Sequence, residues 1–142
     1  HTRGHISVWF AESDALFCGD TLFALGCGRV FEGTMEEMWT SLVKLRSLSP
    51  TAKIYCGHEY TLSNAKFALS IDSENSKLRN RVKDFETMRS EGMPTIPSVL
   101  VNELETNPFL RADDPILATT MGMAGADPVS VFSEIRRQKD NF

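Results

Sequence analysis

Two short strand-like runs in this sequence end in the same way, at a glycine followed by a side chain that can bind a metal or a proton. The first run is Ala15 to Cys18, followed by Gly19-Asp20, and the second is Lys53 to Cys56, followed by Gly57-His58. Side chains just past the ends of neighbouring strands share one edge of a sheet, where functional sites are commonly built. The pattern therefore predicts a sheet with Asp20 and His58 at a common rim.

A further run before the first strand predicts a hairpin. His5 to Phe10 alternates, with Ile6, Val8 and Phe10 on one face, and the polar segment Glu12 to Asp14 joins it to the next run. Two alternating runs joined by a short polar turn are typical of an antiparallel pair of strands.

A helix is expected between the two strand ends. Residues 24 to 33 are rich in glycine but also hold large side chains, which indicates an ordered loop. Thr34 and Glu37 then form a capping box, and apolar side chains recur at helical spacing from Met35 until Pro50. These elements together predict an α/β arrangement for the first part of the chain.

The second part of the chain has a helical pattern. Helices are expected at about Thr61 to Ile71 and at about Ser76 to Ser90, and then glycines and prolines interrupt the pattern. The fold class predicted from this change is α/β followed by an all-helical part. We place the division between residues 1–65 and residues 66–142.

Two later segments begin with proline, a common first residue of a helix. Asp113 and Asp127 are the acidic residues expected to cap them. The last segment runs from Asp127 to about Lys139 and places Val129, Phe132 and Ile135 on one face.

Charge and composition limit the partners of the chain. The 142 residues contain 15 basic and 19 acidic side chains, a net charge of −4, which argues against a nucleic acid as the main partner. No run of eighteen apolar residues is present, so no membrane partner is expected. The three cysteines, Cys18, Cys27 and Cys56, form no Cys-x-x-Cys pair and fit reduced thiols in a reducing compartment.

Histidines and one carboxylate form the first candidate site. His1, His5 and His58 are the three histidines of the chain, and all precede residue 60. Imidazole nitrogen together with the Asp20 carboxylate is a ligand set for zinc, iron or manganese. The alternative for each side chain is a hydrogen bond to a loop backbone. Three ligands fit a mononuclear site with an open position, or half of a larger site.

Positive charges form the second candidate site. Arg136, Arg137 and Lys139 lie at the end of the last expected helix, where cations stabilise the negative end of the helix dipole. The functional alternative is a binding site for carboxylates. Arg29, in the glycine-rich loop, is a further candidate cation, and Tyr60 is a candidate hydroxyl donor.

Several motifs resemble one enzyme family. His1-Thr2-Arg3-Gly4-His5 is similar to a metal motif of metallo-β-lactamase-fold hydrolases, and other strings narrow the resemblance to glyoxalase II, the hydroxyacylglutathione hydrolases. These strings are Gly19-Asp20-Thr21-Leu22-Phe23, Gly26-Cys27-Gly28-Arg29, Phe31-Glu32-Gly33-Thr34, Gly57-His58-Glu59-Tyr60-Thr61, Thr106-Asn107-Pro108-Phe109-Leu110-Arg111 and Arg136-Arg137-Gln138-Lys139-Asp140. The resemblance covers the whole chain.

The resemblance implies a fold and a missing partner. It implies the second half of a metallo-β-lactamase αββα sandwich followed by a C-terminal α-helical domain that binds substrate. The family's His-x-His-x-Asp-His motif, which supplies the remaining metal ligands, has no match in this chain. Because the chain also begins at His1 rather than Met, we expect the C-terminal part of a longer protein, with the upstream half of the same protein as its partner. A cytoplasmic location is expected, with a mitochondrial one as the alternative.

The resemblance also implies residue roles. His1 would bind the first of two divalent metal ions, His58 the second, and Asp20 would bridge both and be the catalytic carboxylate, whereas His5 matches a position that is not a ligand. Zinc is the expected metal, with iron or manganese as alternatives. The residues that would hold the glutathione part of the substrate are Arg29, Phe31, Tyr60, Arg136 and Lys139. Phe31 stands where several family members have tyrosine.

The implied reaction is hydrolysis of the thioester S-D-lactoylglutathione. A hydroxide bridging the metals would attack the thioester carbonyl and give D-lactate and glutathione. The chain by itself is expected to be inactive. The alternatives are another metallo-β-lactamase-fold enzyme, such as a lactonase or a persulfide dioxygenase, and a metal-free helical interaction domain.

Overall fold

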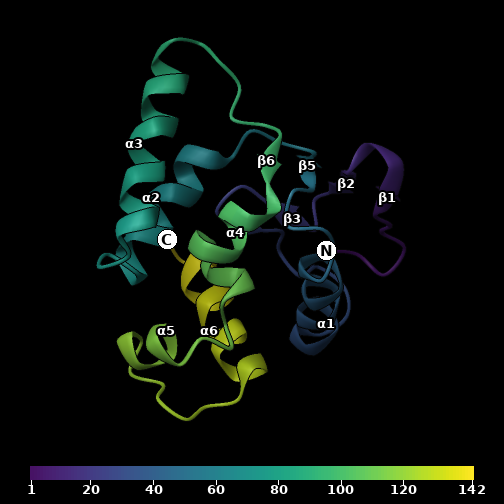
Figure 1. Cartoon of the computed structure of the whole chain (residues 1–142). Coiled ribbons are helices and arrows are strands. Elements are labelled where there is room, and N and C mark those ends of the chain that lie inside the picture. The colour runs from purple at the N-terminus through teal and green to yellow at the C-terminus, as the bar shows by residue number, and fades with distance from the viewer.

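The computed structural model describes all 142 residues, with a small sheet on one side and most of the helices on the other (Figure 1). The main sheet contains β1 (Val8–Phe10), β2 (Ala15–Gly19), β5 (Lys53–Cys56) and β6 (Ser98–Val99), in the order β1-β2-β5-β6. β1 pairs antiparallel with β2, which confirms the expected hairpin, although the first strand begins only at Val8. β2 pairs parallel with β5, so the two strands end at the same edge.

A second, two-stranded sheet overlaps the start of the glycine-rich loop. β3 (Leu22–Phe23) and β4 (Gly26–Cys27) pair antiparallel with each other. The expected loop therefore begins with paired residues, Gly26 and Cys27.

The turn of the first hairpin, between β1 and β2, is the short 3-10 helix η1 (Ala11–Ser13). Asp14 ends it in the left-handed conformation, with φ at 50°.

Helices make up most of the remaining chain. They are α1 (Met35–Arg46), α2 (Thr61–Ile71), α3 (Ser76–Ser90), α4 (Leu100–Thr106), the 3-10 helix η2 (Pro108–Leu110), α5 (Pro115–Thr120) and α6 (Pro128–Asp140). The capping box at α1 is confirmed, because Thr34 Oγ1 accepts from the Glu37 amide at 3.1 Å and Glu37 Oε2 accepts from the Thr34 amide at 2.8 Å. None of these helices has the length and hydropathy required to cross a membrane.

One detail of the expected helices was wrong. The cap of α5 is Asp114, directly before the proline, whose carboxylate accepts from the Ile116 amide at 2.9 Å, and not Asp113. In α6, Val129, Phe132 and Ile135 all pack against the core, which confirms the expected face, and Val131 is buried beside them.

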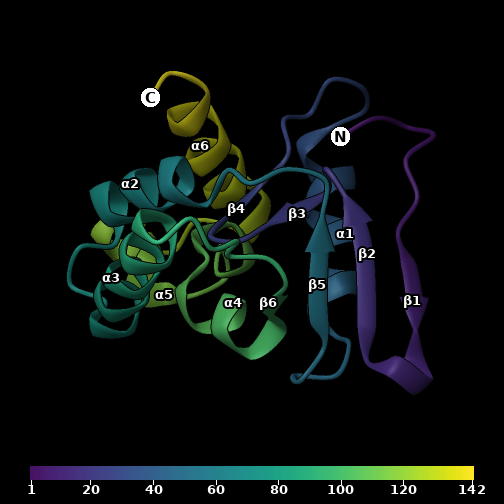
Figure 2. The same ribbon diagram turned by 90° about the horizontal axis from the view of Figure 1, so that it is seen from above.

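One hydrophobic core joins the sheet to the helices. It combines Leu16 and Ile54 of the sheet with Leu42 of α1 and with Phe109 and Phe132 of the later helices. Figure 2 shows the sheet beside the helical part, with α1 against the sheet. The division at residues 65 and 66 falls within α2 and stays a proposal.

The two faces of the sheet differ in what covers them. Trp9 of β1 and the side chains of Leu16 and Cys18 in β2 face the core. The opposite face carries an apolar strip that we call the outer-face strip, made of Val8, Phe10, Phe17 and Tyr55. Phe10 is 52% exposed and Phe17 is 47% exposed. The rings of Phe17 and Tyr55 stack with centroids 4.7 Å apart. A row of exposed aromatic side chains on this scale is typical of a surface that another segment covers.

An ion pair between α1 and the segment before α5 gives a test of the packing. Arg46 donates to the carboxylate of Asp113 and to the Leu110 carbonyl oxygen at 2.8 Å. The hydrogen bond from Arg46 holds the pKa of the Asp113 carboxyl below its usual value.

We expect Asp113→Asn to lower the melting temperature at neutral pH. A lowered folded-state pKa gives stability that is present above the unfolded-state pKa of about 4 and is lost as the pH falls through the folded value. The difference in melting temperature between wild type and variant should therefore shrink as the pH is lowered below about 4. A difference that stays constant down to acid pH would contradict a contribution from the ionised pair.

Candidate metal centre and substrate cleft

The parallel ends of β2 and β5 bring Asp20 and His58 together. The Gly57 amide donates to the Gly19 carbonyl oxygen at 2.9 Å, which ties the two strand ends. His58 Nδ1 lies 2.8 Å from Asp20 Oδ1, within hydrogen-bonding distance. A Cβ at Gly57 would lie 2.6 Å from that carboxylate oxygen, so Gly57 provides the space that Asp20 occupies.

His1 lies near the other oxygen of the same carboxylate. His1 Nε2 lies 3.6 Å from Asp20 Oδ2, and His1 Nδ1 lies 3.0 Å from the carbonyl oxygen of Arg29. A carbonyl partner on one ring nitrogen orients the other nitrogen, an arrangement typical of metal-binding histidines. The amide of Phe31 also donates to the His1 carbonyl oxygen at 3.0 Å. The three side chains predicted as metal ligands therefore meet around Asp20, at one rim of the sheet.

His5 supports the backbone beneath this carboxylate. Its Nε2 accepts from the Asp20 amide at 3.2 Å, and its Nδ1 lies 3.2 Å from Thr21 Oγ1. Gly19 passes directly over the ring with φ at 49°, and a Cβ there would lie 2.5 Å from His5 Nε2. Both ring nitrogens are thus used within the protein, which agrees with a supporting role.

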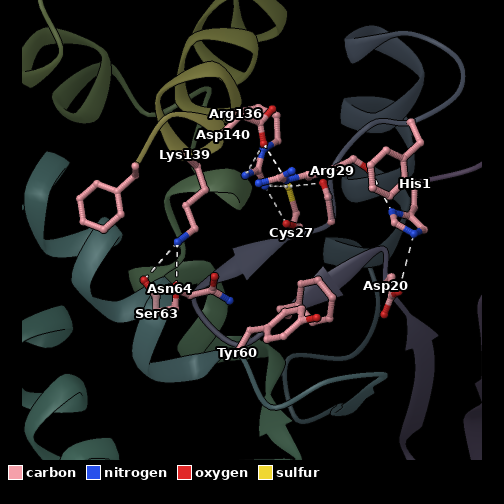
Figure 3. Close-up of a pocket in the computed structure, with 14 residues that line it drawn as sticks. His1, Asp20, Cys27, Arg29, Tyr60, Ser63, Asn64, Arg136, Lys139 and Asp140 are labelled. Atoms are coloured by element: carbon pink, nitrogen blue, oxygen red, sulfur yellow. Dashed lines mark hydrogen bonds and ion pairs between the residues drawn. The ribbon is translucent and has the colours of Figure 1, made fainter.

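A cavity of about 670 Å³ extends from His1 and Asp20 to the end of α6 (Figure 3). The predicted substrate residues Arg29, Phe31, Tyr60, Arg136 and Lys139 all line it, together with His1 and Asp20. His58 lies just outside this lining, but its ring stacks on Tyr60 with centroids 4.9 Å apart. The ring of Phe31 lies 4.8 Å from that of His1. One space therefore connects the two candidate sites that the sequence indicates.

The two cations of α6 that line the cavity, Arg136 and Lys139, differ in their exposure and bonding. The Arg136 side chain is 4% exposed, donates to the Cys27 carbonyl oxygen at 2.8 Å and pairs with Asp140 at 2.9 Å. Its Nε is the one nitrogen of this side chain without a partner. Lys139 Nζ donates to the Ser63 carbonyl oxygen at 3.1 Å, a bond that a ligand can replace. Burial lowers the pKa of Lys139, and the charges of Arg136 and Arg29 lower it further.

Two family models match this chain. The model for the C-terminus of hydroxyacylglutathione hydrolase matches residues 59–142, and the model for the metallo-β-lactamase superfamily matches residues 1–58. The chain belongs to the hydroxyacylglutathione hydrolase family. This confirms the resemblance and the fold class, which is the end of a metallo-β-lactamase-like unit followed by the family's helical C-terminal part.

Curated relatives that match the chain are named hydroxyacylglutathione hydrolase. Those of Methylococcus capsulatus and Rhodospirillum rubrum are each 54% identical over 142 residues, which cover all of this chain and 56% of each relative. That of Rhodopseudomonas palustris (strain CGA009) is 55% identical over 141 residues, 99% of this chain and 55% of the relative. The chain thus spans a little over half the length of these hydroxyacylglutathione hydrolases.

A divalent metal fits the residues that meet at Asp20. Membership of the metallo-β-lactamase superfamily implies divalent metal ions, and imidazole and carboxylate are the ligand types that zinc, iron and manganese accept. Each Asp20 oxygen faces a different histidine, as expected of a bridging carboxylate. However, no group of three or more histidine, cysteine, aspartate or glutamate side chains is arranged to hold a metal ion. The ligand roles of His1, Asp20 and His58 therefore stay predictions.

The sequence did not indicate several of the residues that line this cavity. Asp140 lies between two cations, 3.4 Å from Arg29 and 2.9 Å from Arg136. Its position four residues after Arg136 places the two side chains on one face of a helix, and this spacing is the sequence pattern that could have indicated the pair. Asn64 and Cys27 also line the cavity. Burial raises the pKa of the Cys27 thiol to about 11, so this thiol is protonated at neutral pH and is a poor nucleophile.

Proposed function

We propose that the full-length protein containing this chain hydrolyses S-D-lactoylglutathione to D-lactate and glutathione. The observation that carries the proposal is the single cavity joining Asp20 and His1 to Arg29 and Lys139. A glutathione thioester has its reactive carbonyl at one place and its carboxylates at a distance from it. A cleft with metal-binding side chains at one end and cations at the other matches this distribution.

At the metal end, His1, Asp20 and His58 are the residues that would hold two divalent metal ions, with zinc expected and iron or manganese as alternatives. When bound, the metal ions supply Lewis acidity, which lowers the pKa of the attacking water and offsets negative charge on the thioester oxygen. Asp20 faces both histidines, so it is the residue that would place the two ions together. The remaining ligands are proposed to come from the upstream half of the same protein.

At the other end, the chain's own side chains bind the glutathione part. Lys139 and Arg29 provide positive charge for its carboxylates, and Tyr60 provides a hydroxyl group beside the metal end. Phe31 provides ring contact but no hydroxyl group. Arg136 acts mainly by holding the Cys27 backbone and Asp140, because little of its guanidinium is exposed to the cleft. Binding energy at this end positions the carbonyl carbon at the other.

We expect Lys139→Ala in the full-length enzyme to raise KM for S-D-lactoylglutathione by about tenfold, the effect of losing one charge-assisted hydrogen bond. kcat should change much less, because a contact made equally in the ground state and the transition state affects KM alone. Steady-state kinetics measure both quantities.

Arg137→Ala is the matched control for Lys139→Ala. Arg137 lies two residues away on α6, but it pairs with Glu134 on the surface and does not line the cavity. Its KM should match that of the wild type. An unchanged KM in Lys139→Ala would remove Lys139 from the substrate site, and hydrolysis of lactones without turnover of the thioester would contradict the proposed reaction.

A further inference from the structure

The turn between β3 and β4 has an unusual backbone that the helical part of the chain holds in place. Leu25 is in the left-handed conformation, with φ at 56°, which a residue with a branched side chain rarely adopts. Its amide donates to Glu103 Oε2 of α4 at 2.9 Å. A carboxylate from a segment more than seventy positions away thus stabilises this strained residue.

Two asparagine side chains hold the carbonyl groups of the same turn. Asn107 Nδ2 donates to the carbonyl oxygens of Phe23 at 3.2 Å and Gly26 at 3.1 Å. Asn64 Nδ2 of α2 donates to the Ala24 carbonyl oxygen at 3.1 Å. Together with Glu103, these side chains satisfy four main-chain groups of one turn. We call Asn64, Glu103 and Asn107 the turn clamp.

The turn clamp is buried and internally connected. Glu103 and Asn107 are completely buried, and Asn107 Nδ2 also lies 3.0 Å from Glu103 Oε2. Arg81 of α3 pairs with the other oxygen of Glu103 and compensates its charge. Hydrogen bonds in such a buried network are stronger than those at the surface, and an unsatisfied member is costly.

The backbone that leaves this turn forms the middle of the cleft. Cys27, Gly28 and Arg29 follow directly and line the cavity. The Arg29 side chain faces the cation end, whereas its carbonyl oxygen lies 3.0 Å from His1 Nδ1 at the metal end. Displacing this short segment would therefore move both a substrate cation and the partner that orients His1.

We propose that the turn clamp of Asn64, Glu103 and Asn107 positions the cleft segment Cys27 to Arg29, so that the helical part of the chain sets the geometry at both ends of the cleft. The three are positioning residues, since they act through the main chain of the turn. The catalytic consequence rests on the proposed function, whereas the effect on the turn itself does not.

The first experiment measures hydrogen exchange in the full-length protein by mass spectrometry. In Asn64→Ala and in Asn107→Ala, the peptide covering β3, β4 and Arg29 should exchange about tenfold faster. The first variant removes the Asn64 donor to the Ala24 carbonyl oxygen, and the second removes the Asn107 donor to the carbonyl oxygens of Phe23 and Gly26. Asn102→Ala is the matched control, because Asn102 is on α4 but exposed. If Asn107→Ala fails to fold, Asn64→Ala alone decides. Unchanged exchange at the turn, or acceleration spread evenly over the protein, would overturn the proposal.

A second variant tests the clamp from the side of the turn. A Cβ at Gly26 would lie 2.5 Å from Asn64 Nδ2, although Gly26 does not line the cavity. Gly26→Ala should therefore displace the Asn64 side chain and accelerate exchange at the turn. In the Asn64→Ala background the same substitution should add little, because the displaced group is already absent. Fully additive effects would show that Gly26 and Asn64 act independently.

Kinetics of the same variants test the catalytic consequence. Gly26→Ala should raise KM and lower kcat for S-D-lactoylglutathione together, because the cleft segment contacts both ends of the site. Faster exchange at the turn with unchanged kinetics would overturn the positioning of the cleft. If the wild-type protein does not turn over the thioester, the proposed function fails, and the exchange measurements still decide whether the clamp holds the turn.

Discussion

Full-length protein carrying Asp20→Asn is expected to lose at least about a hundredfold in kcat/KM for S-D-lactoylglutathione. Removing a residue that only supports a metal ligand typically costs about 10- to 100-fold, and Asp20 is proposed to be a ligand shared by both metal ions. An asparagine retains the shape of the side chain but has one oxygen, and its amide nitrogen does not bind a metal ion. Asp20→Asn therefore cannot face His1 and His58 with an oxygen on each side.

The measurement combines steady-state kinetics with metal analysis of the purified protein. Bound metal should fall along with activity in Asp20→Asn. Asp84→Asn is the matched control, because Asp84 is an exposed residue of α3 outside the cavity, and it should retain both. Full metal content with wild-type turnover in Asp20→Asn would remove Asp20 from the metal site.

The rim of the sheet could be predicted because its signals are local in the sequence. A strand followed by glycine and then Asp20 or His58 specifies where each side chain emerges, and the parallel pairing of β2 and β5 then brings them together. The helix boundaries were equally local. α2 and α3 lie at the expected residues, and the capping box of Thr34 begins α1.

The errors and omissions have physical causes. β6 is only two residues long and pairs with β5. Because two residues show no periodic pattern, this strand could not be predicted from the sequence. Two adjacent acidic residues precede Pro115, and because proline takes the first helical position, the residue directly before it, Asp114, is the cap. Asp113, one position earlier, pairs with Arg46 instead.

The proposed substrate end of the cleft depends on contacts between distant segments. Sequence motifs indicated Arg136 and Lys139 alike, but whether a cation is buried or available depends on what packs around it. Arg136 is enclosed by Phe109 and the Cys27 backbone, whereas Lys139 reaches across to Ser63. Asp140 and Asn64 join the site only because α6 and α2 lie beside β4, which no local pattern indicates.

The chain alone is expected to hydrolyse no S-D-lactoylglutathione and to bind metal ions only weakly. It brings His1, Asp20 and His58 together, yet no complete metal-binding group is present, so added zinc has few partners to replace its water ligands. The test is to purify the chain with added zinc, determine the bound metal, and assay hydrolysis beside the full-length protein. Binding of two metal ions per chain with hydrolysis near the full-length rate would refute the proposed need for the upstream half.

The chain alone is also expected to self-associate through the outer-face strip. Phe10 and Phe17 are about half exposed, and their rings contact at a centroid distance of 5.8 Å, so the strip presents continuous apolar surface on an edge hairpin. The double variant Phe10→Ser/Phe17→Ser should shift the chain toward monomer in light scattering coupled to size exclusion. Ile116→Ser removes an apolar side chain that is 73% exposed on α5, away from the strip, and should leave association unchanged. In the full-length protein we expect the upstream half to cover the strip, so Phe10→Ser/Phe17→Ser should instead lower the melting temperature, because the same rings would then be buried. Equal melting temperatures for the full-length variant and its parent would mean that the upstream half does not pack on this face.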